Sequence, residues 1–198
     1  MQVQKTIKFK VGELRKGKQE LIDLALNNSI NAIKDFMELS LKNKTTSNKK
    51  LHHLGYKKIV KKYNLPACIV HQSRNKAREI IKSWKTNKYR LHKNIPMPEP
   101  KAHRIRFNNV VFGIIKTENK EYQFWVSILV AKRNRIYIPL IVNSEWQKEY
   151  LNDLINNKYK KGSADLVKKD ADYFVHIVIG KEINFKQKEN YNPIGIDI

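Results

Sequence analysis

An alternation of polar and apolar residues opens the chain and predicts a β-strand over residues 2–11. The apolar residues fall at even spacing, so one face of this strand is expected to be buried. They are Val3, Ile7, Phe9 and Val11. Because a lone strand is not stable, it must pair with strands encoded much later in the chain.

Helical spacing follows the first strand. Between about Lys18 and Lys42 apolar residues recur at steps of three and four, which predicts a long amphipathic helix. A polar loop separates it from a second helix, expected from about Lys49 to Tyr63. Pro66 then opens a third helix, expected to reach about Lys85, because proline fits the first turn of a helix.

The pattern becomes mostly β after a linker over residues 87–103. Strands are expected at Arg104–Phe112, Tyr122–Lys132, Arg135–Val142, Gly162–Lys168 and Asp172–Gly180. Pro139 makes the third of these an edge strand or a bent barrel strand. Ser144 and Gln147 have the spacing of a capping box, which predicts a short helix.

These elements predict the α+β class. The first strand most simply joins the later strands in a small, partly open β-barrel, with the three helices as an insertion. The expected boundaries are 1–12 for the first strand, 13–95 for the helical lobe and 96–190 for the rest of the barrel. Residues 191–198 form a separate final segment.

Composition points to a polyanionic partner. The 198 residues include 41% hydrophobic residues, enough for a packed core, and carry a net charge of +22. Such an excess favours nucleic acid or an anionic membrane surface as the partner, and the strands around the amphipathic segments favour nucleic acid. No run of about 18 apolar residues and no signal peptide is seen, so a cytoplasmic protein, nucleoid-associated when bound to DNA, is expected.

Basic side chains are the candidate binding residues. They are Lys57, Lys58, Lys61 and Lys62 in the second helix, His71, Arg74, Arg78, Lys82 and Lys85 in the third, and Lys132, Arg133 and Arg135 at a β-turn. We interpret them as a track for phosphates; the alternative is an ordinary solvated surface. His52 and His53 have no third ligand at suitable spacing and are interpreted as solvated, so no metal site is predicted.

The last seven residues carry a lone carboxylate, Asp197, between β-branched residues. A carboxylate in a strand buried on both faces is costly, so it usually binds a metal ion or takes part in proton chemistry. The alternative is a polar residue at a frayed chain end.

Six segments occur in an order that is typical of one family. They are Leu65-Pro66, Ile80–Trp84, Arg135–Leu140, Gly162–Lys169, Tyr173–Ile177 and Ile194–Ile198. Over the whole chain this order resembles the N-terminal half of TnpB, the transposon-encoded, RNA-guided nuclease (OrfB-type transposase) related to type V CRISPR effectors. The resemblance implies a wedge barrel, a helical recognition lobe and the truncated first strand of a RuvC-like nuclease fold.

The resemblance also implies partners: a structured guide RNA and double-stranded DNA that carries a short recognition motif. The matching motif-reading positions are His71, Gln72, Asn108 and Asn109. Asn and Gln suit adenine because each can donate and accept at its N6 and N7. The alternative is a simple turn at Asn108-Asn109 and an ordinary first helical turn at Gln72.

Asp197 matches the first catalytic carboxylate of that family. Two-metal hydrolysis needs several carboxylates, so this chain alone is expected to be inactive, and Mg²⁺ is expected only in a complete nuclease. Two alternatives remain open. One is a nuclease completed in trans by a second chain that carries the other carboxylates, and the other is an RNA-guided repressor that binds DNA without cutting.

Overall fold

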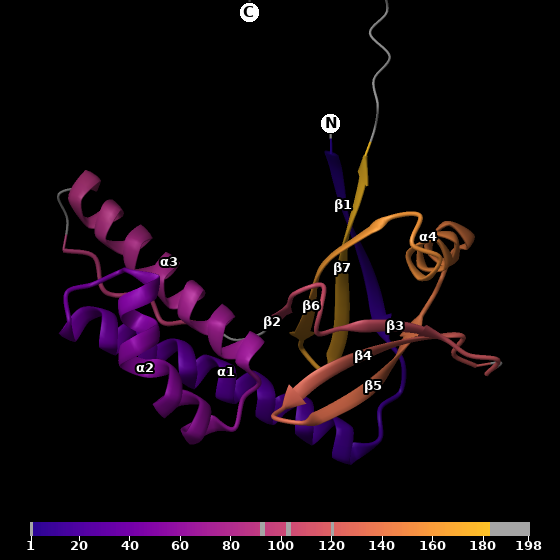
Figure 1. The fold of residues 1–198 in the computed structure, drawn as a ribbon, viewed down its shortest axis with the longest axis horizontal. Coiled ribbons are helices and arrows are strands. Elements are labelled where there is room, and N and C mark those ends of the chain that lie inside the picture. Colours follow the sequence, from indigo (N-terminus) through magenta and orange to yellow (C-terminus); the bar gives the residue numbers. More distant parts are fainter. Residues whose placement is uncertain (1, 92–93, 102–103, 120, 183–198) are drawn as a thin grey trace, which may run out of the picture.

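The structure, a computed structural model, describes residues 2–91, 94–101, 104–119 and 121–182. Within these residues the fold is α+β, with one curled sheet and a group of helices beside it (Figure 1). The predicted strand around Asp197 lies outside the described residues.

The sheet contains seven described strands in the order β2-β6-β7-β1-β5-β4-β3, and every pairing is antiparallel. The strands are β1 (Gln2–Val11), β2 (Arg104–Phe107), β3 (Gly113–Lys116), β4 (Phe124–Ala131), β5 (Asn134–Ile141), β6 (Lys160–Lys169) and β7 (Asp172–Glu182). The sheet curls so that β3, β4 and β5 cross the direction of β1, β6 and β7 (Figure 1). This is the partly open barrel that the sequence predicts.

β1 holds the two halves of the sheet together. It pairs with β7 from Gln2 to Lys10, and its last residues pair with β5. Ile7 and Phe9 are buried as the alternation predicts, whereas Val3 is 38% exposed near the chain start. The first strand therefore joins strands encoded more than 120 residues later, as its isolation in the sequence required.

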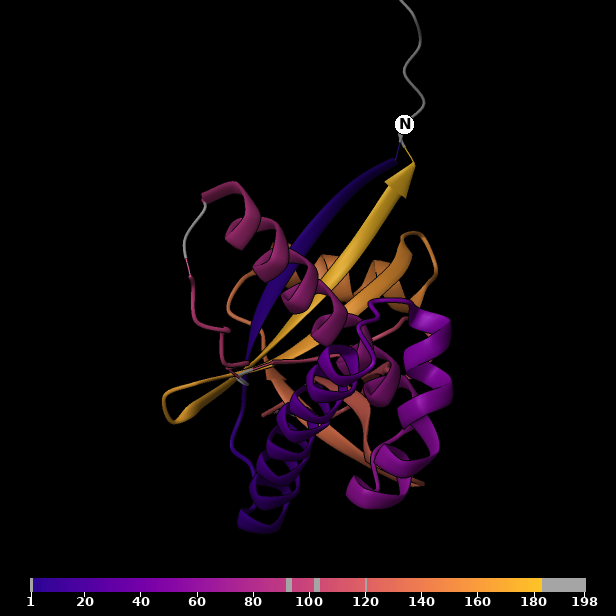
Figure 2. The same cartoon turned by 90° about the vertical axis from the view of Figure 1, so that its left-hand side faces the viewer.

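Three helices are inserted between β1 and β2, and a fourth lies between β5 and β6. They are α1 (Lys16–Lys42), α2 (Asn48–Tyr63), α3 (Ala67–Leu91) and α4 (Glu145–Ile155). Helices α1, α2 and α3 pack on one another at one side of the sheet (Figure 1), and Figure 2 shows them in front of it. Their buried faces form one hydrophobic core with the strands.

Polar contacts fix the helices to the sheet. The Asp23 carboxylate of α1 accepts hydrogen bonds from Nζ of Lys168 at 2.8 and 2.9 Å and from the Tyr173 hydroxyl at 2.7 Å. The backbone N–H of Lys132, at the β4–β5 turn, donates to the carbonyl of Asn64 at 3.0 Å. Asn64 ends α2 in the left-handed conformation, φ 51°, which asparagine tolerates.

Several sequence-based boundaries are wrong. Helix α3 continues to Leu91, so residues 87–91 are helix and not linker. The expected strand 104–112 ends at Phe107, and the separate strand β3 was not foreseen. Ser144 makes no side-chain capping bond; instead, Gln147 accepts from the backbone N–H of Asn143 and donates to the Lys8 carbonyl.

The β5 proline is not on an outer edge of the sheet. Pro139 pairs with Trp125 on β4, and its carbonyl accepts from the N–H of Gly12 at 2.9 Å. In a strand the N and C=O of one residue point to the same side, so the proline nitrogen faces the end of β1. Because proline has no N–H, only the last hydrogen bond of the short β1–β5 ladder is absent.

Candidate nucleic-acid interface

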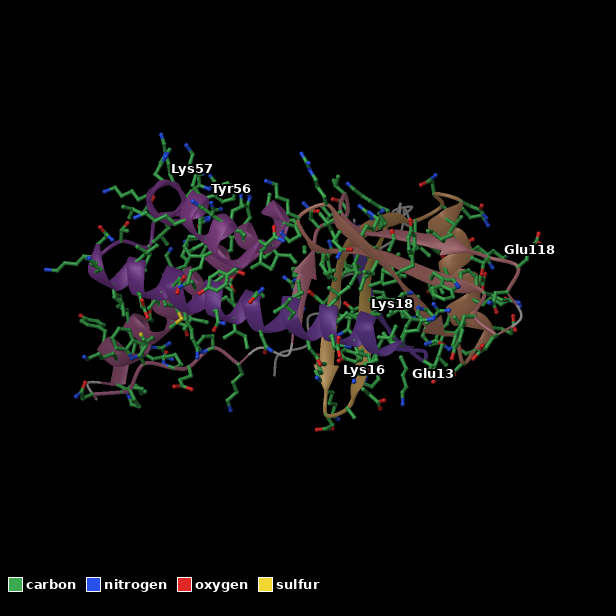
Figure 3. The ribbon with its side chains drawn as sticks, turned by 90° about the horizontal axis from the view of Figure 1, so that it is seen from below. Glu13, Lys16, Lys18, Tyr56, Lys57 and Glu118 are labelled. Carbon is green, nitrogen blue, oxygen red and sulfur yellow. The ribbon has the colours of Figure 1, made fainter. Side chains whose placement is uncertain are left out.

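Helix α2 presents a row of exposed lysines because its apolar residues, Leu51 and Ile59, are buried against the other helices. Lys57, Lys58 and Lys61 are exposed, and Lys57 projects outward from the helix beside Tyr56 (Figure 3).

Lys62 differs from these three lysines. Its Nζ lies 2.9 Å from the Asp35 carboxylate, which also accepts from the Tyr63 hydroxyl at 3.0 Å. Hydrogen bonds to Tyr63 and Asp35 raise the pKa of Lys62 above its ordinary value, so its charge is already compensated within the protein.

The β4–β5 turn brings a further lysine to α2. Because Lys132 is bonded through its backbone to Asn64, its side chain reaches the C-terminal part of that helix. A pocket of about 390 Å³ opens there; it is lined by Tyr56, Lys57, Val60, Lys61, Asn64 and Lys132. Three lysines from two distant segments thus surround one opening, which we call the lysine pocket.

A cluster of ring side chains and one arginine joins α2 to α3. His52 stacks on Tyr56 with ring centroids 4.5 Å apart. His71 approaches both rings edge-on, at 5.4 Å from His52 and 5.3 Å from Tyr56. A guanidinium N–H of Arg74 donates to Nδ1 of His52 at 3.1 Å. We call these four residues the ring cluster.

Within the described part of the chain, no carboxylate is among the groups that shift the pKa of His71 or Arg74. Burial, Arg74 and His52 lower the pKa of His71, and burial and Arg78 lower the pKa of Arg74. Nε of Arg74 is buried and has no hydrogen-bond partner among the described residues. Because the Arg74 and Arg78 charges disfavour each other, a phosphate beside them would be stabilised.

The remaining basic positions lie either on α3 or at the β4–β5 turn and the start of β5. Arg78 is half-buried near Arg74, whereas Lys82 and Lys85 are exposed further along α3. Arg133 is exposed in the turn with φ 61°, and Arg135 donates to the Ser127 hydroxyl at 3.0 Å. The turn lies at Lys132-Arg133, one residue earlier than the sequence suggests, because Asn134 already belongs to β5.

The four positions expected to read a DNA motif do not share one surface. His71 faces α2, whereas Gln72, the next residue of α3, lines a pocket against β2. Asn108 follows β2, and its side-chain oxygen accepts from the N–H of Val111 at 3.2 Å. Asn109 is exposed in the same turn. Asn108 therefore has the role of a turn residue, and Gln72 is the amide that lies beside other polar groups.

Sequence reasoning missed three groups in and beside this interface. His52 was interpreted as solvated but contacts Arg74 and Tyr56. Arg104 and Arg106 of β2 both bind Asp165 of β6. The alternation of β2 could have marked its arginines as outward-facing, but the carboxylate opposite them is set by strand register, which no local pattern reveals.

The described residues contain no group of three or more His, Cys, Asp and Glu side chains that could hold a metal ion. Asp197 lies outside them. None of the helices in the described part is both long and apolar enough to cross a membrane. No protein-family model matches the sequence, and no curated protein matches it.

Proposed function

We propose that this chain binds nucleic acid through the lysine pocket and the ring cluster. The observation that carries the proposal is the convergence of Lys57, Lys61 and Lys132, from a helix and a distant β-turn, around one opening. Lys62, the neighbouring lysine with a carboxylate partner, lies in a different contact with Asp35. Clustered cations without acidic partners are the electrostatic footprint of a phosphate-binding surface.

The resemblance to TnpB supports a more specific form of the proposal. The chain would bind a structured guide RNA and double-stranded DNA as the N-terminal part of an RNA-guided nuclease. The supporting observations are the α+β fold, the three helices inserted after the first strand, and the basic faces of α2 and α3.

The salt dependence of binding tests the general proposal. Each phosphate contact contributes about 0.9 to the slope of log affinity against log salt on duplex DNA. Changing Lys57, Lys61 and Lys132 together to Ala should therefore flatten the slope by roughly two to three. Fluorescence anisotropy with labelled duplex DNA and labelled structured RNA measures it.

A charge-matched control separates this surface from net charge alone. Lys10, Lys148 and Lys158 each lie within 4 Å of a carboxylate, at 2.8, 3.7 and 2.9 Å. Changing these three to Ala removes the same total charge and should flatten the slope much less. Equal slopes for the two triple variants would contradict the proposal, as would wild-type protein that binds neither probe at low salt.

Bound RNA tests the more specific form. Protein purified at low salt from the cells that naturally make it should retain a defined RNA. The sequence of that RNA should be continuous with a sequence that matches a DNA target. Recovery of mixed cellular RNA with no common sequence would leave nucleic-acid binding in place and remove the guide-RNA assignment.

A further inference from the structure

A row of charged residues crosses the outer face of the sheet, opposite the core. Strand register places Lys8 of β1 beside His176 of β7, His176 beside Asp165 of β6, and Asp165 beside Arg106 of β2. Residues on either side of each row position, such as Ile7 and Ile177, are buried in the core. Side chains alternate along a strand, so the four row residues share the outward face.

Asp165 is the buried centre of this row. Its side chain is 2% exposed, whereas those of Arg104 and Arg106 are 51% and 48% exposed. Arg106 donates from Nε to one carboxylate oxygen at 2.9 Å and from Nη2 to the other at 3.5 Å. Arg104 donates from Nη2 to that second oxygen. One buried carboxylate thus accepts hydrogen bonds from two half-exposed guanidinium groups that lie side by side.

The two arginines keep donors for a ligand. A guanidinium has five N–H groups. The bonds to Asp165 use two nitrogens of Arg106 and one of Arg104. The hydrogen bond to Asp165 raises the pKa of Arg106, so its charge is retained. Lys8 is exposed on the same face, so the three positive charges of Lys8, Arg104 and Arg106 outnumber the two carboxylates that act on Arg106, Asp165 and Glu79.

A pocket adjoins the arginine pair. It has a volume of about 230 Å³ and lies between α3 and β2, with Gln72 and Asn75 among its lining residues together with Arg104 and Arg106. Glu79, the carboxylate that lines this pocket, lies 3.7 Å from Lys76. Amide and guanidinium groups, which can donate hydrogen bonds, are therefore among the groups that line the pocket.

We propose that Arg104 and Arg106 form a second phosphate site for the nucleic-acid backbone, and that Asp165 is a positioning residue that orients both guanidinium groups. This inference rests on the proposed nucleic-acid binding but uses a different surface from the lysine pocket. Arginine suits the task because its planar fork can give two parallel hydrogen bonds to a phosphate, which a lysine cannot. A buried carboxylate fixes the direction of that fork.

The direction in which one substitution changes the affinity for nucleic acid tests the positioning role of Asp165. Asp165→Asn removes a negative charge, so electrostatics alone predicts tighter binding to nucleic acid. If Asp165 orients the arginines, the variant binds more weakly instead. Asp172→Asn is the matched control because it makes the same charge change at an exposed residue, which pairs with Lys10 at 2.8 Å. We expect Asp172→Asn to bind as tightly as wild type or tighter.

A second variant keeps the inference testable if Asp165→Asn does not fold. Replacing Arg104 and Arg106 together by Lys keeps the charge and removes both forks. The salt slope should stay close to that of wild type, while affinity falls about tenfold, the loss of one charge-assisted hydrogen bond. If the two arginines served only to stabilise the fold, the double Lys variant would show altered thermal unfolding. It would not show a lower affinity together with an unchanged salt slope.

The ring of His176 supplies a local readout by NMR. His176 lies beside Asp165 in the register, and its Nε2 is buried without a hydrogen-bond partner among the described residues. Its resonances should shift when wild-type protein is titrated with duplex DNA or structured RNA, and much less in the double Lys variant. Inorganic phosphate as a separate titrant shows whether a free anion is sufficient.

The outcomes are distinct from those of the proposed function. Unchanged affinity in the double Lys variant, or tighter binding by Asp165→Asn to the same degree as by Asp172→Asn, would overturn the second site. The effect of the lysine-pocket substitutions would be untouched by either result. Loss of nucleic-acid binding in every assay of the wild type would instead remove the proposed function itself.

Discussion

The contact of α1 with the β6–β7 hairpin gives the sharpest stability prediction. Asp23 accepts a hydrogen bond from the buried Tyr173 at 2.7 Å and pairs with Lys168 at 2.8 Å. These bonds link residues 145 and 150 positions apart and hold the helical lobe against the sheet. Asp23→Ala removes both bonds, and Tyr173→Phe removes only the hydrogen bond from the tyrosine hydroxyl. The double variant completes the cycle.

The magnitudes follow from burial. The side chains of Asp23 and Lys168 are 38% and 32% exposed, so their ion pair contributes about 0–1 kcal/mol. The hydrogen bond from Tyr173, which is only 7% exposed, to a carboxylate is worth about 1.5–3 kcal/mol. We expect Tyr173→Phe to lower the unfolding free energy by about 1.5–3 kcal/mol, and Asp23→Ala, which also removes the ion pair, by about 1.5–4 kcal/mol.

Urea unfolding of the two single variants and the double variant gives the coupling energy. We expect about 1.5–3 kcal/mol, because each substitution alone already removes the shared hydrogen bond. A coupling within about 0.3 kcal/mol of zero would refute this assignment of the stability. Burial and Asp23 also raise the pKa of Tyr173. The stability that this gives is present below the ordinary tyrosine pKa and is lost as the pH rises through the raised value, and Tyr173→Phe should remove that loss.

Two further predictions concern binding and packing. Burial, Arg74 and His52 lower the pKa of His71. A bound phosphate would favour the protonated ring, so nucleic-acid affinity should rise as the pH falls toward the range in which His71 takes up a proton. Anisotropy at several pH values should show a flatter profile for His71→Gln, and an identical profile would contradict this role. A Cβ at Gly162 would lie 2.8 Å from the carbonyl oxygen of Val178, so Gly162→Ala should cost about 1–3 kcal/mol. Thermal unfolding compares it with Gly17→Ala in α1, where a Cβ meets nothing within 4 Å and no loss is expected.

Local patterns predict most of the elements. Even spacing marked β1 and the buried face of β7, where Tyr173, Val175, Ile177 and Ile179 all point into the core. Steps of three and four marked α1, α2 and α3. Both patterns work because burial of one face requires a period of two in a strand and 3.6 in a helix.

The main error in the predicted strands lies where the chain changes direction between β2 and β3. In the segment 104–116 apolar residues lie on both sides of Asn108-Asn109, so periodicity alone does not separate β2 from β3, although a turn at these asparagines was one interpretation of the sequence. The turn after Phe107 is set by the Asn108 side chain, which bonds the backbone of Val111. Such turn chemistry competes with strand propensity, and only the three-dimensional context decides between them.

For the candidate sites, the sequence by itself determined the excess of positive charge and its concentration on α2 and α3. It could not distinguish Lys62, which is compensated by Asp35 from α1, from Lys61, which is exposed at the lysine pocket. It could not place Lys132 beside α2 or Asp165 beneath two arginines either. Periodicity is local because the backbone geometry of a single helix or strand fixes which of its side chains share a face. The partner of a charged side chain is chosen by register and packing between distant segments, and only the tertiary structure fixes these.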